Sequence, residues 1–271
     1  MKIGMSQMGK FTGLAMLGLL SSTGLAAAQS PATGHPAEKA ATASATQAAA
    51  TTQSFATSFD GDENPLSEGG TWLHTNNTYT KAAKVSGVAH GTQSGSPSQQ
   101  RANLYDDSYA ILSGFSPNQK ASGVFQRSSG TIDSSCSHEV EILLRWADSS
   151  NGARGYECLI NHDGGYAQIM RWNGTYGSFT ELAGNSFTGL KSGDRIECQA
   201  VGNVITMSIN GTKLAEATDG TYATGNPGVG FFRGNCGSNS DVGFTSFEAS
   251  GSDGAFDETV KPKAPADLTV D

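Results

Sequence analysis

The sequence predicts an all-β protein in which two antiparallel sheets are stacked on one another. Apolar and polar residues alternate with a period of two in many short runs between Phe55 and Gly251, which is the pattern of half-buried strands. Gly contributes 35 of the 271 residues without a three-residue repeat, which is typical of chains with many tight turns. No amphipathic stretch is long enough to compete as a helix. Short strands at this spacing favour a sandwich or a barrel, and the pairing of an apolar with a more polar face favours the sandwich.

The clearest expected strand is the run 139–146. Its positions 140, 142, 144 and 146 are apolar and share one face, whereas Glu139, Glu141, Leu143 and Arg145 share the other. The Asp-Gly-Gly turn at 163–165 separates two further runs, 156–161 and 166–172, as in a hairpin. The other expected strands are 109–114, 121–127, 195–201, 204–209, 213–217, 229–232 and 242–247.

The first part of the chain is typical of an exported protein. Residues 1–28 combine a basic start at Lys2 and Lys10, an apolar stretch too short to span a bilayer, and an Ala run suited to signal peptidase. We therefore expect a signal peptide and a secreted or periplasmic protein with no membrane span. Residues 29–54 are rich in Ala and Thr and predict a disordered linker, 55–251 predict one folded domain, and 252–271 predict a disordered tail.

All four cysteines lie after the signal peptide. An even number in an exported chain predicts two disulfides rather than a metal site, and their spacing matches no zinc pattern. Four cysteines allow three pairings. We prefer Cys136–Cys236, because both lie in loop sequence, and Cys158–Cys198, because both lie on strand patterns.

The charge of the chain restricts its partners. The formal net charge is −8, so a nucleic acid or an anionic membrane is not expected as a partner. We expect a monomer.

Several segments together resemble the concanavalin A-like lectin/glucanase (LamG-like) superfamily. They are Phe59-Asp60 with Asn64-Pro-Leu66 and Trp72, then Tyr156 to Trp172, Gly193 to Ile196, Ile205 to Gly211, Gly228 to Phe231 and Asp241 to Phe247. The resemblance covers most of residues 55–250 and implies a two-sheet antiparallel jelly-roll β-sandwich. Members include sugar-binding modules, glycoside hydrolases and polysaccharide lyases, so the shared fold does not choose among these activities.

The hairpin around Trp172 carries the expected carbohydrate site. Sugar rings stack on aromatic faces, and their hydroxyl groups bond to amide, carboxylate and guanidinium groups. The residues of these types on this hairpin are Tyr166, Gln168, Arg171, Trp172, Asn173 and Tyr176. We therefore predict a lectin-like protein that recognises a polysaccharide, and an adhesion or structural role stays open as an alternative.

A polysaccharide-degrading enzyme is the other alternative. Retaining glucanases of the resembled superfamily carry a Glu-x-Asp-x-x-Glu strand, and the nearest match here is Glu139-Val-Glu141 with Leu144 in the third place, which we interpret as a solvated strand face. Lyases of this fold use Arg, Gln, His and Tyr. Their Gln-Ile-His motif is absent, and the weak candidates are Arg145, His162, Tyr166 and Gln168.

The resemblance also implies a structural Ca²⁺ ion. Many jelly rolls of the superfamily join their first and last strands through such an ion. Here Asp60 and Asp62, with Glu63, could meet Asp241 near the end of the domain, and their hard oxygen ligands suit Ca²⁺.

Overall fold

The computed structural model describes residues 52–74, 78–93, 107–128, 137–234, 237–254 and 256. All of them belong to one compact unit, Ala48–Asp271. The expected signal peptide (1–28), residues 29–51 of the expected linker and residues 257–271 of the expected tail lie outside the described residues. Among the described residues, no helix has the length and apolar character needed to cross a bilayer.

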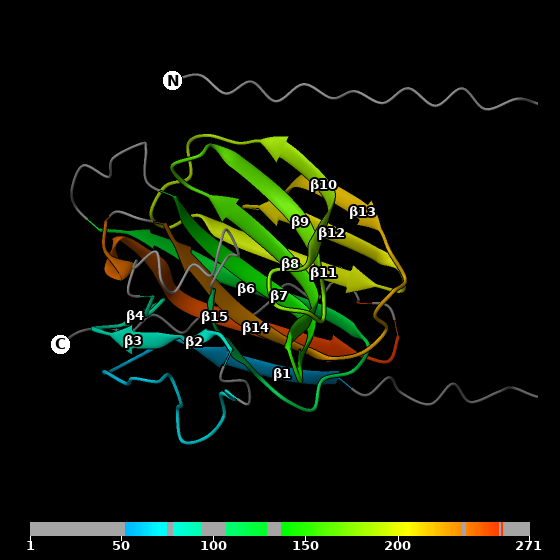
Figure 1. The fold of residues 1–271 in the computed structure, drawn as a ribbon, viewed down its shortest axis with the longest axis horizontal. Helices are drawn as coiled ribbons and strands as arrows, with labels where there is room; N and C mark the ends of the chain where they lie inside the picture. The colour runs from blue at the N-terminus through cyan, green and yellow to red at the C-terminus, as the bar shows by residue number, and fades with distance from the viewer. Residues whose placement is uncertain are drawn as a thin grey trace, which may run out of the picture. The chain divides into compact units, whose positions relative to one another are not determined.

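The first layer is an eight-stranded sheet that holds both ends of the described chain. Its strands run in the order β13 (Thr212–Thr218), β12 (Val204–Ile209), β11 (Arg195–Val201), β6 (Asn118–Arg127), β15 (Val242–Ser252), β4 (Val88–His90) and β3 (Ala83–Val85). The first strand, β1 (Thr52–Thr57), pairs with β15, and Figure 1 shows the two lying side by side. Asn210 and Gly211, with φ of 50° and 79°, make the tight turn between β12 and β13.

The second layer is a seven-stranded sheet. Its order is β10 (Phe179–Ser186), β9 (Tyr166–Asn173), β8 (Gly152–Asn161), β7 (His138–Ser149), β14 (Asn226–Arg233), β5 (Ser108–Ile111) and β2 (Thr80–Lys81). Within the described residues, every strand pair is antiparallel except β2 with β5. In the part of the chain that the structure describes, the one helical element is the short 3₁₀ turn η2 (Asn239–Asp241) before β15. The predicted all-β sandwich of two antiparallel sheets is confirmed.

The main core lies between the two layers. It contains Val140, Ile142 and Leu144 from β7, together with Phe125 from β6 and Phe247 from β15, each at most 1% exposed. Burying such a side chain contributes about 1.5–3 kcal/mol each. Because these residues alternate along their strands, the intervening side chains of the seven-stranded sheet point to its outer face, away from the other layer.

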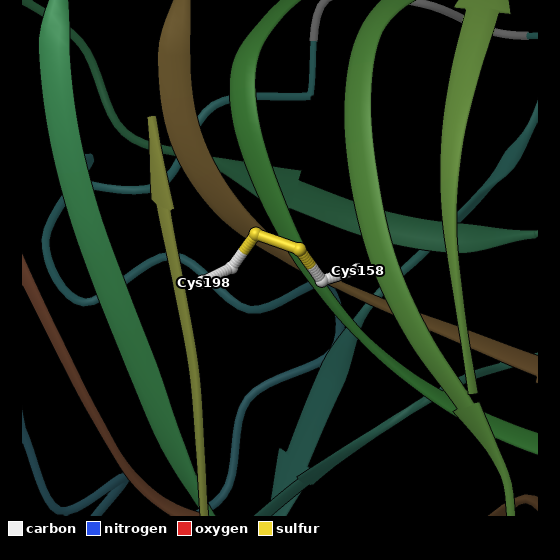
Figure 2. Close-up of a disulfide and its surroundings, with 2 residues drawn as sticks. All are labelled: Cys158 and Cys198. Atoms are coloured by element: carbon white, nitrogen blue, oxygen red, sulfur yellow. A yellow bond between two sulfur atoms is a disulfide. The ribbon is translucent and has the colours of Figure 1, made fainter. Parts of the chain in front are cut away.

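A disulfide also joins the layers. Cys158 on β8 bonds to Cys198 on β11, whose Cα atoms are 6.1 Å apart, and Figure 2 shows the sulfur–sulfur bond crossing between the two strands. This is the pairing expected for these two cysteines. Cys136 and Cys236, the other expected pair, lie outside the described residues.

The alternation along β7 breaks at Arg145. This residue has a φ of 50°, and the pairing of β7 with β8 shifts by one residue between Leu144 and Ala147, which is a β-bulge. As a result Trp146 packs with Leu143 on the outer face instead of sharing the core face with Val140. The expectation of an unbroken alternation from 139 to 146 is therefore wrong at its last two positions.

Candidate functional site

The outer face of the seven-stranded sheet carries a cleft of about 340 Å³. Its residues come from neighbouring strands in register. Three rows of cross-strand neighbours run over β7, β8 and β9 on this face. They are Glu139–Asn161–Tyr166, Glu141–Leu159–Gln168 and Leu143–Glu157–Met170. The edge strand β10 adds Phe179 and Glu181, which pair with Trp172 and Met170 of β9. The cleft therefore combines apolar and aromatic surface with amide, phenol and carboxylate groups.

Four buried carboxyl groups on this face are here called the acidic cluster: Asp107, Glu139 and Glu157, which line the cleft, and Glu141 beside them. Glu141 is 1% exposed and Glu157 is 2% exposed. One carboxylate oxygen from each of Asp107, Glu139 and Glu141 lies within 4.8 Å of the other two oxygens. The sequence interpretation of Glu139 and Glu141 as a solvated strand face is therefore wrong, because their side of the sheet is covered.

Neutral donors hold two members of the acidic cluster. Asn161 Nδ2 and the Tyr166 hydroxyl each donate to Glu139 Oε1 at 2.9 Å. The Trp172 indole donates to Glu157 Oε2, which connects the acidic cluster to the aromatic part of the cleft. By contrast, Glu141 Oε1 is buried and has no hydrogen-bond partner.

Burial and mutual repulsion shift the ionisation of these carboxyl groups. Burial raises the pKa of Glu157 to about 8, assisted by the negative charge of Glu139 and opposed by the bond from Trp172. The pKa of Glu141 is raised well above its ordinary value, first by burial and then by the charges of Glu157, Asp107 and Glu139. Burial also raises the pKa of Glu139, although the bonds from Asn161 and Tyr166 oppose the shift.

A glycine makes room for the central carboxylate. Gly230 of β14 is paired with Glu141 of β7. A Cβ atom at this glycine would overlap Glu141 Oε2, and the next two atoms that it would meet, at 3.0 and 3.1 Å, are Cδ and Cβ of the same Glu141. The missing side chain therefore lets the Glu141 carboxylate lie across β14.

The other end of the outer face is an aromatic cluster, made of Tyr79, Tyr109, Trp146, Trp172, Tyr176 and Phe179. Trp172 is central, with ring centroids 5.6 Å from those of Tyr79, Trp146 and Phe179. It is only 3% exposed, so it forms the floor of the cleft rather than an open stacking platform. Phe179 is half-buried and offers the more accessible ring.

The structure brings together Tyr166, Gln168 and Trp172 of the expected carbohydrate-binding residues in this cleft. Tyr176 stacks on Tyr79 in the aromatic cluster, with ring centroids 5.1 Å apart. The other two lie elsewhere. Arg171 alternates to the opposite side of β9, where it pairs with Asp219 and bonds to Thr221 Oγ1 at 3.0 Å, and its Nε donates to Asn173 Oδ1.

Two of the weak catalytic candidates also lie away from the cleft. Arg145 is 1% exposed and donates to the carbonyls of Pro117, Tyr222 and Gly202 at 2.8–3.0 Å, which makes it a structural residue of the β-bulge. His162 stacks on Phe125 with ring centroids 5.7 Å apart. Of the four candidates, Tyr166 and Gln168 alone line the cleft.

The expected Ca²⁺ ligands are not brought together. Asp60 is exposed, Asp62 Oδ1 accepts from the Ser86 backbone at 2.7 Å, and Asp241 Oδ2 accepts from the Ser238 backbone at 2.7 Å. Of the described His, Cys, Asp and Glu residues, the one group of three with ligand atoms close enough to share an ion is Asp107, Glu139 and Glu141. The structure therefore does not gather these carboxylates at one site: Asp62 caps a backbone amide of the turn between β3 and β4, and Asp241 caps one at the start of η2.

Several solved structures match this chain at low sequence identity. The carbohydrate-binding module CBM66 from Bacillus subtilis is 12% identical, with a TM-score of 0.46 over 63% of this chain and 96% of that one. The Caenorhabditis elegans galectin LEC-6 is 17% identical, with a TM-score of 0.37 over 54% of this chain and 93% of that one. The exoplasmic/lumenal domain of VIP36, in a form bound to Ca²⁺ and Man3GlcNAc, is 12% identical, with a TM-score of 0.44 over 62% of this chain and 80% of that one. No protein-family model and no curated protein matches the sequence. The sheet order by itself gives the chain the all-β, two-sheet sandwich that the period-two alternation predicts.

Proposed function

We propose that this protein binds a neutral polysaccharide in the cleft on the outer face of its seven-stranded sheet. One observation carries the proposal: an accessible aromatic ring, Phe179, an amide, Gln168, a phenol, Tyr166, and a carboxylate, Glu181, converge on one cleft. Sugar rings need apolar contact on their faces and hydrogen bonds at their edges, and these groups supply both.

The charge of the cleft favours neutral glycans. Glu181 is exposed at its edge, and no Lys or Arg is among the residues that line it. A polyuronate would place its own negative charges beside the exposed carboxylate of Glu181 with no cationic group to compensate them, so it should bind more weakly than a neutral polymer. The volume of about 340 Å³ is at the lower end of ligand sites, which suits contact with one or two sugar units of a longer chain.

We also propose that the protein acts outside the cytoplasm. The disulfide between Cys158 and Cys198 supports this location, because such bonds persist in oxidising compartments. The basic, apolar start of the sequence and its Ala run support export through a cleaved signal peptide.

Affinity electrophoresis in native gels that contain soluble β-glucan, xyloglucan or galactan tests the proposal. We expect at least one of these polymers to retard the protein, and alginate to retard it less. Gln168→Ala should weaken the retardation about tenfold, because a lost hydrogen bond and its desolvated partner together cost about 1.4 kcal/mol.

The matched control is Gln199→Ala. Gln199 is also half-buried, but it lies on β11 in the other sheet, outside the cleft. Equal weakening by both substitutions, or no retardation by any neutral polymer, would remove the proposal. Reducing ends released from a retarding polymer would instead identify a glycosidase, the alternative that the sequence leaves open.

A further inference from the structure

We infer that Asp107, Glu139 and Glu141 form a Ca²⁺ site on the outer face of the seven-stranded sheet. The three carboxylates come from different parts of the chain. Asp107 directly precedes β5, Glu139 and Glu141 lie on β7, and β14 runs between these two strands. This site is separate from the loop carboxylates Asp60, Asp62 and Asp241 that the sequence suggested.

The distances fit a shared ion. One oxygen from each of the three carboxylates lies within 4.8 Å of the others. Ca²⁺ binds oxygen at about 2.3–2.6 Å, so two oxygens on the same ion are separated by at most about 5 Å. The three side chains can therefore coordinate one ion without a change in the strands that carry them.

The unpartnered oxygen points to a ligand. Glu141 is 1% exposed, and its Oε1 atom is buried without a hydrogen-bond partner. Leaving a carboxylate oxygen in this condition costs free energy, which bonding to a cation would remove. Gly230 keeps this position open, because any Cβ there would overlap the carboxylate of Glu141.

The charge balance leads to the same conclusion. Glu139 is held by the neutral donors Asn161 and Tyr166, and among the described residues no Lys or Arg forms an ion pair with Glu139 or Glu141. Adjacent buried carboxylates are stable only when protons or a cation compensate their charges. A divalent cation compensates two of them at once.

The donor set selects the metal. All three ligands are carboxylates, with no Cys or His in the group, which favours a hard cation over Zn²⁺. Ca²⁺ accepts irregular arrangements of oxygen ligands, whereas Mg²⁺ requires a near-ideal octahedron. Asp107 and Glu139 also line the cleft. The remaining ligands of the Ca²⁺ ion would therefore be water or hydroxyl groups that enter from the cleft.

The test titrates Ca²⁺ into protein that has been treated with EDTA and dialysed, with heat of binding and melting temperature as readouts. We expect one ion per chain and a melting temperature that rises with Ca²⁺ concentration, because a ligand of the folded state stabilises it. Glu141→Gln, which keeps the side-chain shape and removes the charge, should weaken binding at least tenfold. No glycan is present, so the result is independent of polysaccharide binding.

Two variants serve as controls. Glu216→Gln removes a carboxylate from an exposed pair with Lys213, and Asp62→Asn alters the loop site suggested by the sequence, so both should bind Ca²⁺ as the wild type does. A second readout is Tb³⁺ emission excited through the aromatic residues, since Trp172 bonds to Glu157 beside the site. This emission should be strong in the wild type and lost in Glu141→Gln.

Folding of Glu141→Gln is checked in the metal-free state. Without Ca²⁺ this variant should melt at or above the temperature of the metal-free wild type, because one buried charge has been removed. The inference is overturned if the wild type binds no stoichiometric Ca²⁺, if Glu141→Gln binds it with unchanged affinity, or if Asp62→Asn abolishes binding.

Discussion

At the scale of single residues, the contact between Gly230 and Glu141 decides whether the acidic cluster can exist. The three nearest atoms that a Cβ at position 230 would meet all belong to Glu141. The requirement for glycine therefore comes from one neighbouring side chain and not from the backbone, since Gly230 is not among the glycines with positive φ. The sequence run Val-Gly-Phe-Phe reveals the strand but not this requirement, because it depends on the neighbouring strand.

A double-mutant cycle measures this contact. Gly230→Ala should destabilise the metal-free protein by about 1–3 kcal/mol, the usual cost of forcing extra volume into a packed site. In the Glu141→Ala background Oε2 and Cδ are absent and Cβ, 3.1 Å away, is the one of these three atoms that remains, so the same substitution should cost less than about 1 kcal/mol. Urea unfolding in EDTA gives the four free energies of unfolding. Equal costs in both backgrounds would show that Glu141 is not what excludes a side chain at position 230.

At the scale of an element, the β-bulge in β7 places Glu157 beside Glu139 and Glu141. Near the turn, Ser149 pairs with Gly152, and continuing this register would set Glu157 opposite Leu144 on the core face. The one-residue shift at Arg145 sets it opposite Leu143 instead, which is on the outer face. The bulge thus determines which side of the sheet carries this third glutamate.

The same bulge explains how much of the site the sequence could predict. Period-two alternation correctly predicted β11 and β12 to the residue and located the hairpin that presents Tyr166 and Gln168. It could not reveal the bulge, because the bonds that hold Arg145 come from Pro117, Gly202 and Tyr222, all remote in the chain.

The period-two alternation also did not predict two further parts of the site. Strand β10, which supplies Phe179 and Glu181, is an edge strand with mostly exposed residues, so it shows no clear apolar face. Asp107 precedes a strand of four residues, Ser108–Ile111, all of them buried, which leaves no alternation to follow. Burial of Glu139 and Glu141 depends on what covers the outer face, which a strand's own pattern does not contain.

Arg145→Lys tests the bulge. A lysine ammonium cannot donate in the planar, forked arrangement that reaches three carbonyls, so we expect a loss of about 2–4 kcal/mol in the free energy of unfolding. The matched control is Arg195→Lys, because Arg195 forms a half-exposed ion pair with Glu248 and should lose at most about 1 kcal/mol. Urea denaturation followed by circular dichroism compares them, and similar losses would argue against a structural role for Arg145 in the bulge.

At the scale of the whole molecule, the residues of the main core and the residues that line the cleft lie on opposite faces of the seven-stranded sheet. The inner faces of both sheets form the main core, while the cleft and the acidic cluster lie on the outer face of one sheet. β8 serves both sides, because Cys158 and Ile160 enter the core while Glu157 and Leu159 face the cleft. The rigid attachment of β8 to the other layer therefore also fixes the position of Glu157.

The disulfide between β8 and β11 should be a large part of that attachment. Its cysteines are separated by 40 residues, and closing a loop of this length in the unfolded chain corresponds to about 4 kcal/mol in the chain-entropy model. We expect the Cys158→Ala/Cys198→Ala variant to lose about this much in urea unfolding under oxidising conditions. Under reducing conditions the free energy of unfolding of the wild type should fall close to that of the variant. The effect of reductant on the variant itself measures any contribution from Cys136 and Cys236. Equal stability of the two proteins in oxidising buffer would show that packing between the sheets, and not the covalent bond, holds β8 in place.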